Sequence, residues 1–254
     1  MNTEELAKQI RISSLKMCHD AKSSHIGSAL SCADILAVLY NEILQKDDKL
    51  IISKGHCASA VYSALYHSGK GRIGRNCIKQ PDLDFYSQNG EMLGGHVTFG
   101  IAGVEVSTGS LGHGLAIGCG MAMVHKGRIF VLMGDGETNE GSVWEATRFA
   151  SEQKLDNLIV IIDNNKLQSF SKCNDNLRAK FEAFGWMVKT TSGNNVSRLS
   201  ATLNHLRNHH FRMPKCVVAH TVKGKGVSFI ENRMDWHYKY PNDEELKMAL
   251  SELQ

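Results

Sequence analysis

The chain has 254 residues, of which 42% are hydrophobic, and this is enough for one large domain with a substantial core. Its 29 Lys and Arg residues nearly balance 26 Asp and Glu residues, so the net charge of +3 gives no reason to expect a nucleic-acid or membrane-surface partner. No apolar run reaches the roughly 18 residues of a membrane span, and the seven cysteines contain no CxxC pair. We expect one cytoplasmic domain over residues 1–254 with reduced thiols.

The first predicted elements are helices at residues 4–18 and 34–45. Asn2 and Glu5 have the spacing of a capping box at the start of the first helix, and Ser31 is a plausible N-cap of the second. The segment "KLIISKGH", 49–56, predicts a short strand that runs into a glycine turn, and residues 68–105 read mostly as loop.

Three apolar runs follow, namely "RIFVLMG" (128–134), "NLIVIID" (157–163) and "KCVVAHTV" (215–222). They are rich in Val and Ile and do not alternate with polar residues, which is typical of strands covered on both faces. Helical patterns separate them, so we predict an α/β fold with a mostly parallel central sheet and helices on both faces. In such sheets a ligand binds outside the carboxyl ends of the strands. We interpret the basic segment "KGKG", 223–226, as a solvated loop.

Polar residues follow two of these runs directly. Asp135 lies between Gly134 and Gly136, and Asn165 ends the next run along the chain. A helix predicted to begin at Glu137 would turn its N–H groups toward Asp135, and such a helix start favours a phosphate. A carboxylate would repel that phosphate unless a divalent cation such as Mg²⁺ joined them, so the pattern favours a metal–diphosphate site. Each dipeptide alone also fits an ordinary turn or strand end. The segment is neither a dinucleotide fingerprint nor a P-loop.

The combination of "GDG" and a later "NN" resembles the thiamine diphosphate motif, and the surrounding segments resemble those of the transketolase family. These segments are "KSSHIGSALSCADILAVLY", "ISKGHCASAVYSAL", "GGHV", "GVEVSTGSLGHGLAIGCGMAM", "FEAFGWMV" and "HTVKGKGVSF", in the family's order. The resemblance covers nearly the whole chain but only the first half of a complete family member. It therefore implies the diphosphate-binding subunit of a split transketolase.

The resemblance implies a role for particular residues. The metal, Mg²⁺ or in its place Ca²⁺ or Mn²⁺, would be bound by the side chains of Asp135 and Asn165 and by the backbone oxygen of Leu167. Thiamine diphosphate would contact His56, Gly109, Leu111, Gly136, Asn165 and His237. Catalysis would involve His25, His56, His96, His237 and Glu140, the last at a subunit interface. His113 also follows a glycine but stands where the family usually has Gln.

The implied reaction transfers a two-carbon ketol unit from a ketose or ketose phosphate donor to an aldose acceptor. The Glu that activates the cofactor belongs to the family's pyrimidine domain, to which no segment here corresponds. We therefore expect a partner subunit that carries this domain, an α2β2 assembly, and no activity of this chain alone.

Three departures from the family pattern leave alternatives open. Ser169-Phe170-Ser171 replaces an I-D-G run, Tyr238 follows His237 where Gly is common, and Ser24 stands where Gly is usual. One alternative is part of another thiamine diphosphate enzyme, similar to deoxyxylulose-phosphate synthase or a 2-oxo acid dehydrogenase. Another is a non-catalytic interaction subunit that retains the fold.

Overall fold

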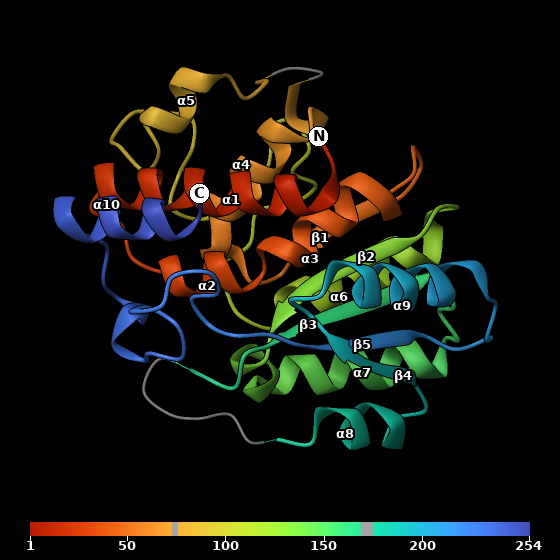
Figure 1. The fold of residues 1–254 in the computed structure, drawn as a ribbon. Coiled ribbons are helices and arrows are strands. Elements are labelled where there is room, and N and C mark those ends of the chain that lie inside the picture. The colour runs from red at the N-terminus through yellow and green to blue at the C-terminus, as the bar shows by residue number, and fades with distance from the viewer. Residues whose placement is uncertain (73–75, 169–174) are drawn as a thin grey trace.

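The computed structural model describes residues 1–72, 76–168 and 175–254. Within them, one parallel sheet has the strand order β1-β2-β3-β5-β4 (Figure 1). The strands are β1 (Lys49–Ile52), β2 (Ile129–Gly134), β3 (Leu158–Asn164), β4 (Met187–Ser192) and β5 (Lys215–His220). The three apolar runs form β2, β3 and β5, so the predicted α/β fold with a parallel sheet is confirmed.

Successive residues of the central strands enter two different hydrophobic cores. In β2, Phe130 and Leu132 pack into one core, while Val131 and Met133 pack into the other. The other inner strands divide in the same way, because successive side chains of a strand point to opposite faces. Burial of both faces explains why these runs are continuously apolar.

Helices cover the two faces. The larger core lies under α1 (Thr3–Asp20), α2 (Ile26–Ser31), α3 (Ala33–Val38), α4 (Ala58–His67), α5 (Gln80–Asp84), α9 (Val196–Asn208) and α10 (Asp243–Glu252). The smaller core lies under α6 (His113–Val124), α7 (Gly141–Glu152) and α8 (Leu177–Ala183). The red helix α1 and the blue helix α10 lie side by side in Figure 1, so the two ends of the sequence pack together.

The first predicted helix is confirmed, but the predicted cap of the second is wrong. Asn2 caps α1 by accepting a hydrogen bond from the N–H of Glu5 at 2.8 Å. Ser31 is instead the last residue of α2, and its hydroxyl donates to the carboxylate of Asp163 at 2.6 Å. The predicted 34–45 helix is α3, which continues into a π-helical turn, Leu39–Ile43.

The six cysteines that the structure describes are free thiols, and five of them are buried; Cys173 lies outside the described residues. Residues 68–105 contain the short helix α5 and a 3₁₀ turn and are otherwise irregular in their described part, as predicted. None of the described helices is long and apolar enough to cross a membrane.

Candidate functional site

The carboxyl ends of the strands border a pocket with a volume of about 420 Å³. All residues that the sequence analysis assigned to metal, cofactor or catalysis line this pocket: His25, His56, His96, Gly109, Leu111, Asp135, Gly136, Glu140, Asn165, Leu167 and His237. They come from segments spread over most of the chain. The parallel sheet brings together those that follow β1, β2 and β3, because its strands end at one edge, and loops elsewhere supply the others.

Two side chains with oxygen donors, Asp135 and Asn165, lie at the ends of β2 and β3. Asp135 is only 3% exposed, and its Oδ1 accepts the N–H of Gly136 at 2.7 Å. Its Oδ2 accepts the N–H of Lys166, and Asn165 Oδ1 accepts the N–H of Leu167 at 3.0 Å. These hydrogen bonds hold one carboxylate and one amide oxygen in a fixed arrangement. Burial raises the pKa of Asp135 to about 6, and the charge of a neighbouring carboxylate adds to this effect.

The segment after Asp135 differs from the prediction. Residues Gly136–Asn139 form a 3₁₀ turn, and α7 begins only at Gly141. The reason lies in Glu137, whose buried carboxylate turns inward and accepts the N–H of Gly112 at 2.9 Å and of Gly134 at 3.2 Å. The hydroxyl of Ser53 donates to the same carboxylate. Burial raises the pKa of Glu137.

Four histidines form a cluster around His25. The centroid of its ring lies 5.1 Å from that of His237, 5.3 Å from that of His56 and 6.2 Å from that of His96. His25 has a left-handed backbone with φ 74°, and its N–H donates to the carbonyl of His237 at 3.0 Å. A non-glycine residue in this conformation is strained, and such strain is often found at functional sites. His25 Nδ1 is buried and has no hydrogen-bond partner among the described residues.

The pocket favours neutral imidazoles. Burial lowers the pKa of His25 and of His237 to about 4, and it lowers that of His56 well below the usual range. Nearby ammonium groups, above all those of Lys54 and Lys223, add to these pKa shifts. A positive charge close to an imidazole disfavours a second one, so these rings are uncharged at neutral pH.

Lys223 is a functional candidate that the sequence analysis missed. Its side chain is fully buried, so the interpretation of "KGKG" as a solvated loop is wrong at this position. Lys223 Nζ donates to the carbonyl of Leu167 at 3.3 Å and to His237 Nδ1 at 2.9 Å. Since an ammonium only donates, Nδ1 accepts and the ring proton of neutral His237 lies on Nε2. Burial lowers the pKa of Lys223 to about 8.

Lys54 is the second missed residue. It lines the pocket, and its ammonium pairs with the buried carboxylate of Asp163. Burial alone would lower the pKa of Lys54, but the charge of Asp163 outweighs it and raises that pKa. Lys54 follows β1 and Lys223 follows β5, which are the strand-end positions that identified Asp135 and Asn165. A search of every strand end would have found both lysines.

Two glycines of the pocket approach other side chains closely. Gly109 has φ 149°, and a Cβ there would lie 3.1 Å from the ring of His96. A Cβ on Gly136 would lie 3.1 Å from the side chain of Gln168. Leu111 and Glu140 are exposed at the pocket, whereas His113 does not line it. Of the three departures, Tyr238 lines the pocket, Ser24 does not, and Ser169 to Ser171 lie outside the described residues.

The oxygen donors suit a hard cation. Asp135, Asn165 and Leu167 offer a carboxylate, an amide and a backbone carbonyl, which are ligands that Mg²⁺ accepts together with substrate phosphates. The described residues contain no cluster of three or more His, Cys, Asp or Glu side chains that could hold a metal.

The structure is a parallel α/β fold with a pocket that contains oxygen donors and histidines, and comparison with known proteins identifies its family. The family described as "Transketolase, thiamine diphosphate binding domain" matches residues 2–253. The chain belongs to the transketolase family and corresponds to its N-terminal, thiamine diphosphate-binding part.

Individual relatives agree with this assignment. The chain is 37% identical to a subunit of apulose-4-phosphate transketolase from Phocaeicola vulgatus, with 94% of this chain and 89% of the relative covered. It is 40% identical to the protein of the same name from Actinobacillus succinogenes, with 98% and 95% covered. The crystal structure of transketolase from Campylobacter jejuni superimposes with a TM-score of 0.90 at 29% identity. All of this chain is covered there but only 43% of the solved chain.

Proposed function

We propose that this chain is the diphosphate-binding subunit of a two-subunit transketolase that transfers a two-carbon ketol unit from a ketose phosphate to an aldose. The main support is one pocket in which the oxygen donors of Asp135, Asn165 and Leu167 lie with four clustered histidines. The relatives named as subunits of apulose-4-phosphate transketolase support a phosphorylated ketose as the donor. A single domain over residues 1–254 and a cytoplasmic location stay predictions.

The residues present fit a metal and a diphosphate. Asp135, Asn165 and Leu167 would hold Mg²⁺ through oxygen, and Gly136 would let the diphosphate approach the backbone. Lys223 supplies a buried positive charge beside Leu167. When bound, thiamine diphosphate supplies an electron sink for carbon–carbon bond cleavage.

The histidines would handle sugar hydroxyls. Neutral imidazoles can accept a proton, and general bases work best when their pKa lies near the working pH. Two lysines contribute to the low pKa of His25. The negative charge of a diphosphate would offset both lysines and so raise this pKa in part, although burial, the main cause of the low pKa, would remain. His56, His96 and His237 surround the same space and would orient the hydroxyls of donor and acceptor.

A partner subunit would complete the site. Glu140 is exposed at the pocket, where it can contact another chain. The partner would carry the pyrimidine domain and the Glu that activates the cofactor, in an α2β2 assembly. We therefore expect this chain to show no ketol transfer alone and to become active when mixed with the product of the neighbouring gene, if that gene encodes such a domain.

The test combines activity with cofactor binding. Calorimetry of the reconstituted pair with thiamine diphosphate and Mg²⁺ should show binding that weakens by roughly 10–100-fold or more in Asp135→Asn. The matched control is Asp47→Asn, which removes an exposed carboxylate. Equal affinity in both variants would contradict the metal assignment. Cofactor binding without ketol transfer would favour another thiamine diphosphate enzyme, and no cofactor binding would favour an interaction subunit.

A further inference from the structure

Tyr238 places an aromatic ring at the pocket beside the catalytic candidates. The residue lines the pocket and is 54% exposed. The centroid of its ring lies 4.7 Å from that of His237 and 6.0 Å from that of His25. A large exposed aromatic side chain in a ligand pocket offers apolar surface against which part of a ligand can pack.

The segment that carries Tyr238 is anchored before it. The carbonyl of His237 accepts the N–H of His25, and Trp236 is buried with its ring 5.5 Å from that of Phe229. Lys239, the residue after Tyr238, is held as well, because its Nζ donates to the carboxylate of Asp235 at 2.7 Å.

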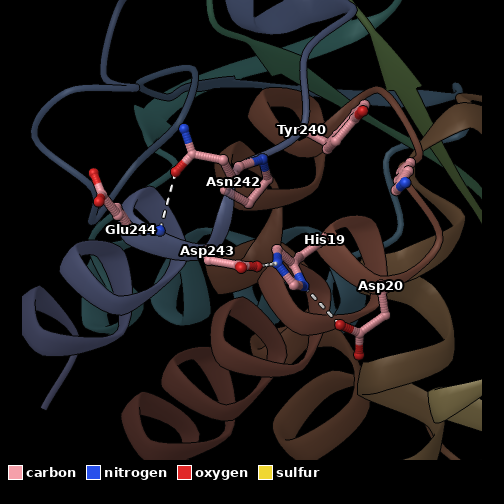
Figure 2. Close-up of a pocket in the computed structure, with 8 residues that line it drawn as sticks. His19, Asp20, Tyr240, Asn242, Asp243 and Glu244 are labelled. Atoms are coloured by element: carbon pink, nitrogen blue, oxygen red, sulfur yellow. Dashed lines mark hydrogen bonds and ion pairs between the residues drawn. The ribbon is translucent and has the colours of Figure 1, made fainter.

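The same segment is anchored after Tyr238, where the chain enters α10. Figure 2 shows the ring of His19 between Asp20 and Asp243, and its nitrogens lie 2.6 Å and 2.8 Å from the two carboxylates. Asn242 caps α10 through the N–H of Glu244 at 3.0 Å. A tyrosine has few rotatable bonds, and a backbone fixed on both sides lowers the entropy lost when the ring meets a ligand.

We propose that Tyr238 determines acceptor specificity by packing against the part of the sugar chain that extends past the histidines. This inference rests on the proposed ketol transfer. The reacting carbons would lie among the imidazoles, and the apolar C–H groups further along the sugar would cover the tyrosine ring. A two-carbon acceptor has little C–H surface beyond its reacting carbon, whereas a five-carbon acceptor has enough to cover the ring. Tyr238 therefore favours the longer aldose.

The experiment uses the reconstituted pair and compares kcat/KM for glycolaldehyde and for ribose 5-phosphate. Tyr238→Ala should lower the ratio of ribose 5-phosphate to glycolaldehyde by about tenfold, as expected for lost apolar contact in a pocket. Tyr238→Phe should keep the wild-type ratio because the ring remains. The matched control is Tyr240→Ala, which removes a ring that is 41% exposed and does not line this pocket.

The outcomes separate this inference from the proposed function. A wild-type pair that transfers to neither acceptor overturns both. Transfer by the wild type with an unchanged ratio in Tyr238→Ala overturns the specificity role alone, and so does an equal loss of activity toward both acceptors. A changed ratio that Tyr240→Ala reproduces also overturns it.

Discussion

Replacing Asp163 by Asn removes the charge that compensates Lys54, and we expect this change to destabilise the fold strongly. The two side chains are 0% and 1% exposed and form a direct ion pair. The carboxylate also accepts hydrogen bonds from the hydroxyls of Ser31 and Thr221. An asparagine can replace part of these hydrogen bonds but leaves the buried ammonium without the carboxylate that pairs with it.

Two routes lead to a similar size for the effect. Removing one partner of a buried ion pair typically costs about 3–5 kcal/mol. Alternatively, Lys54 escapes the penalty by losing its proton, and deprotonating a lysine of ordinary pKa at pH 7 costs about 4.6 kcal/mol at about 1.36 kcal/mol for each pKa unit. Such a loss is a large fraction of the ~5–15 kcal/mol that stabilises a typical domain.

Urea unfolding followed by circular dichroism measures this free energy. Glu152→Gln provides the control, because its partner Arg148 and Glu152 are 71% and 54% exposed and their pair is worth no more than about 0.5 kcal/mol. The double variant Lys54→Met with Asp163→Leu should be more stable than Asp163→Asn, since neither charge of this pair is then buried. A loss below about 1 kcal/mol in Asp163→Asn would refute the reasoning.

Two further predictions concern other parts of the fold. Gly114→Ala in α6 should destabilise by about 1–3 kcal/mol, because its Cβ would lie 2.4 Å from the side chain of Ser53. Gly120→Ala in the same helix should instead stabilise the fold by about 0.5–1 kcal/mol, because a Cβ there meets no described atom within 4 Å. Urea unfolding measures both changes, and a shift in the same direction for both would contradict this prediction. Hydrogen bonds to the two carboxylates in Figure 2 raise the pKa of His19 in the folded protein above 6.5. The protonated ring therefore stabilises the fold below pH 6.5, and this stabilisation is lost as the pH rises through the raised pKa. The stability difference between wild type and His19→Asn should therefore shrink by less than about 1 kcal/mol between about pH 5.5 and 8, and a constant difference would count against this assignment.

The strands that sequence reasoning found are those buried on both faces. β4, with the sequence MVKTTS, gives no continuous apolar run because it exposes Lys189 and Thr190. β1 lies at the other edge of the sheet, but its residues 50–52 are buried and apolar, so its sequence predicted it.

The sequence could predict those site residues whose position in space is determined by the end of a strand. Asp135 and Asn165 follow buried strands, so the shared edge of a parallel sheet brings them together. The burial of Lys223 depends on packing against segments distant in sequence, and a basic composition alone suggested a solvated loop. Ser31 likewise had the residue type of an N-cap, but its hydroxyl bonds to Asp163 across the core.

The carboxylate of Glu137 has a consequence for how the pocket opens. It joins Ser53 after β1, Gly112 before α6 and Gly134 at the end of β2. If any one of these segments separates from the others, the buried carboxylate of Glu137 loses a hydrogen-bond donor. In hydrogen-exchange measurements, the amides of Gly112 and Gly134 should therefore become exposed in the same opening event and show similar protection. One acidic side chain would make the walls of the pocket a single cooperative unit.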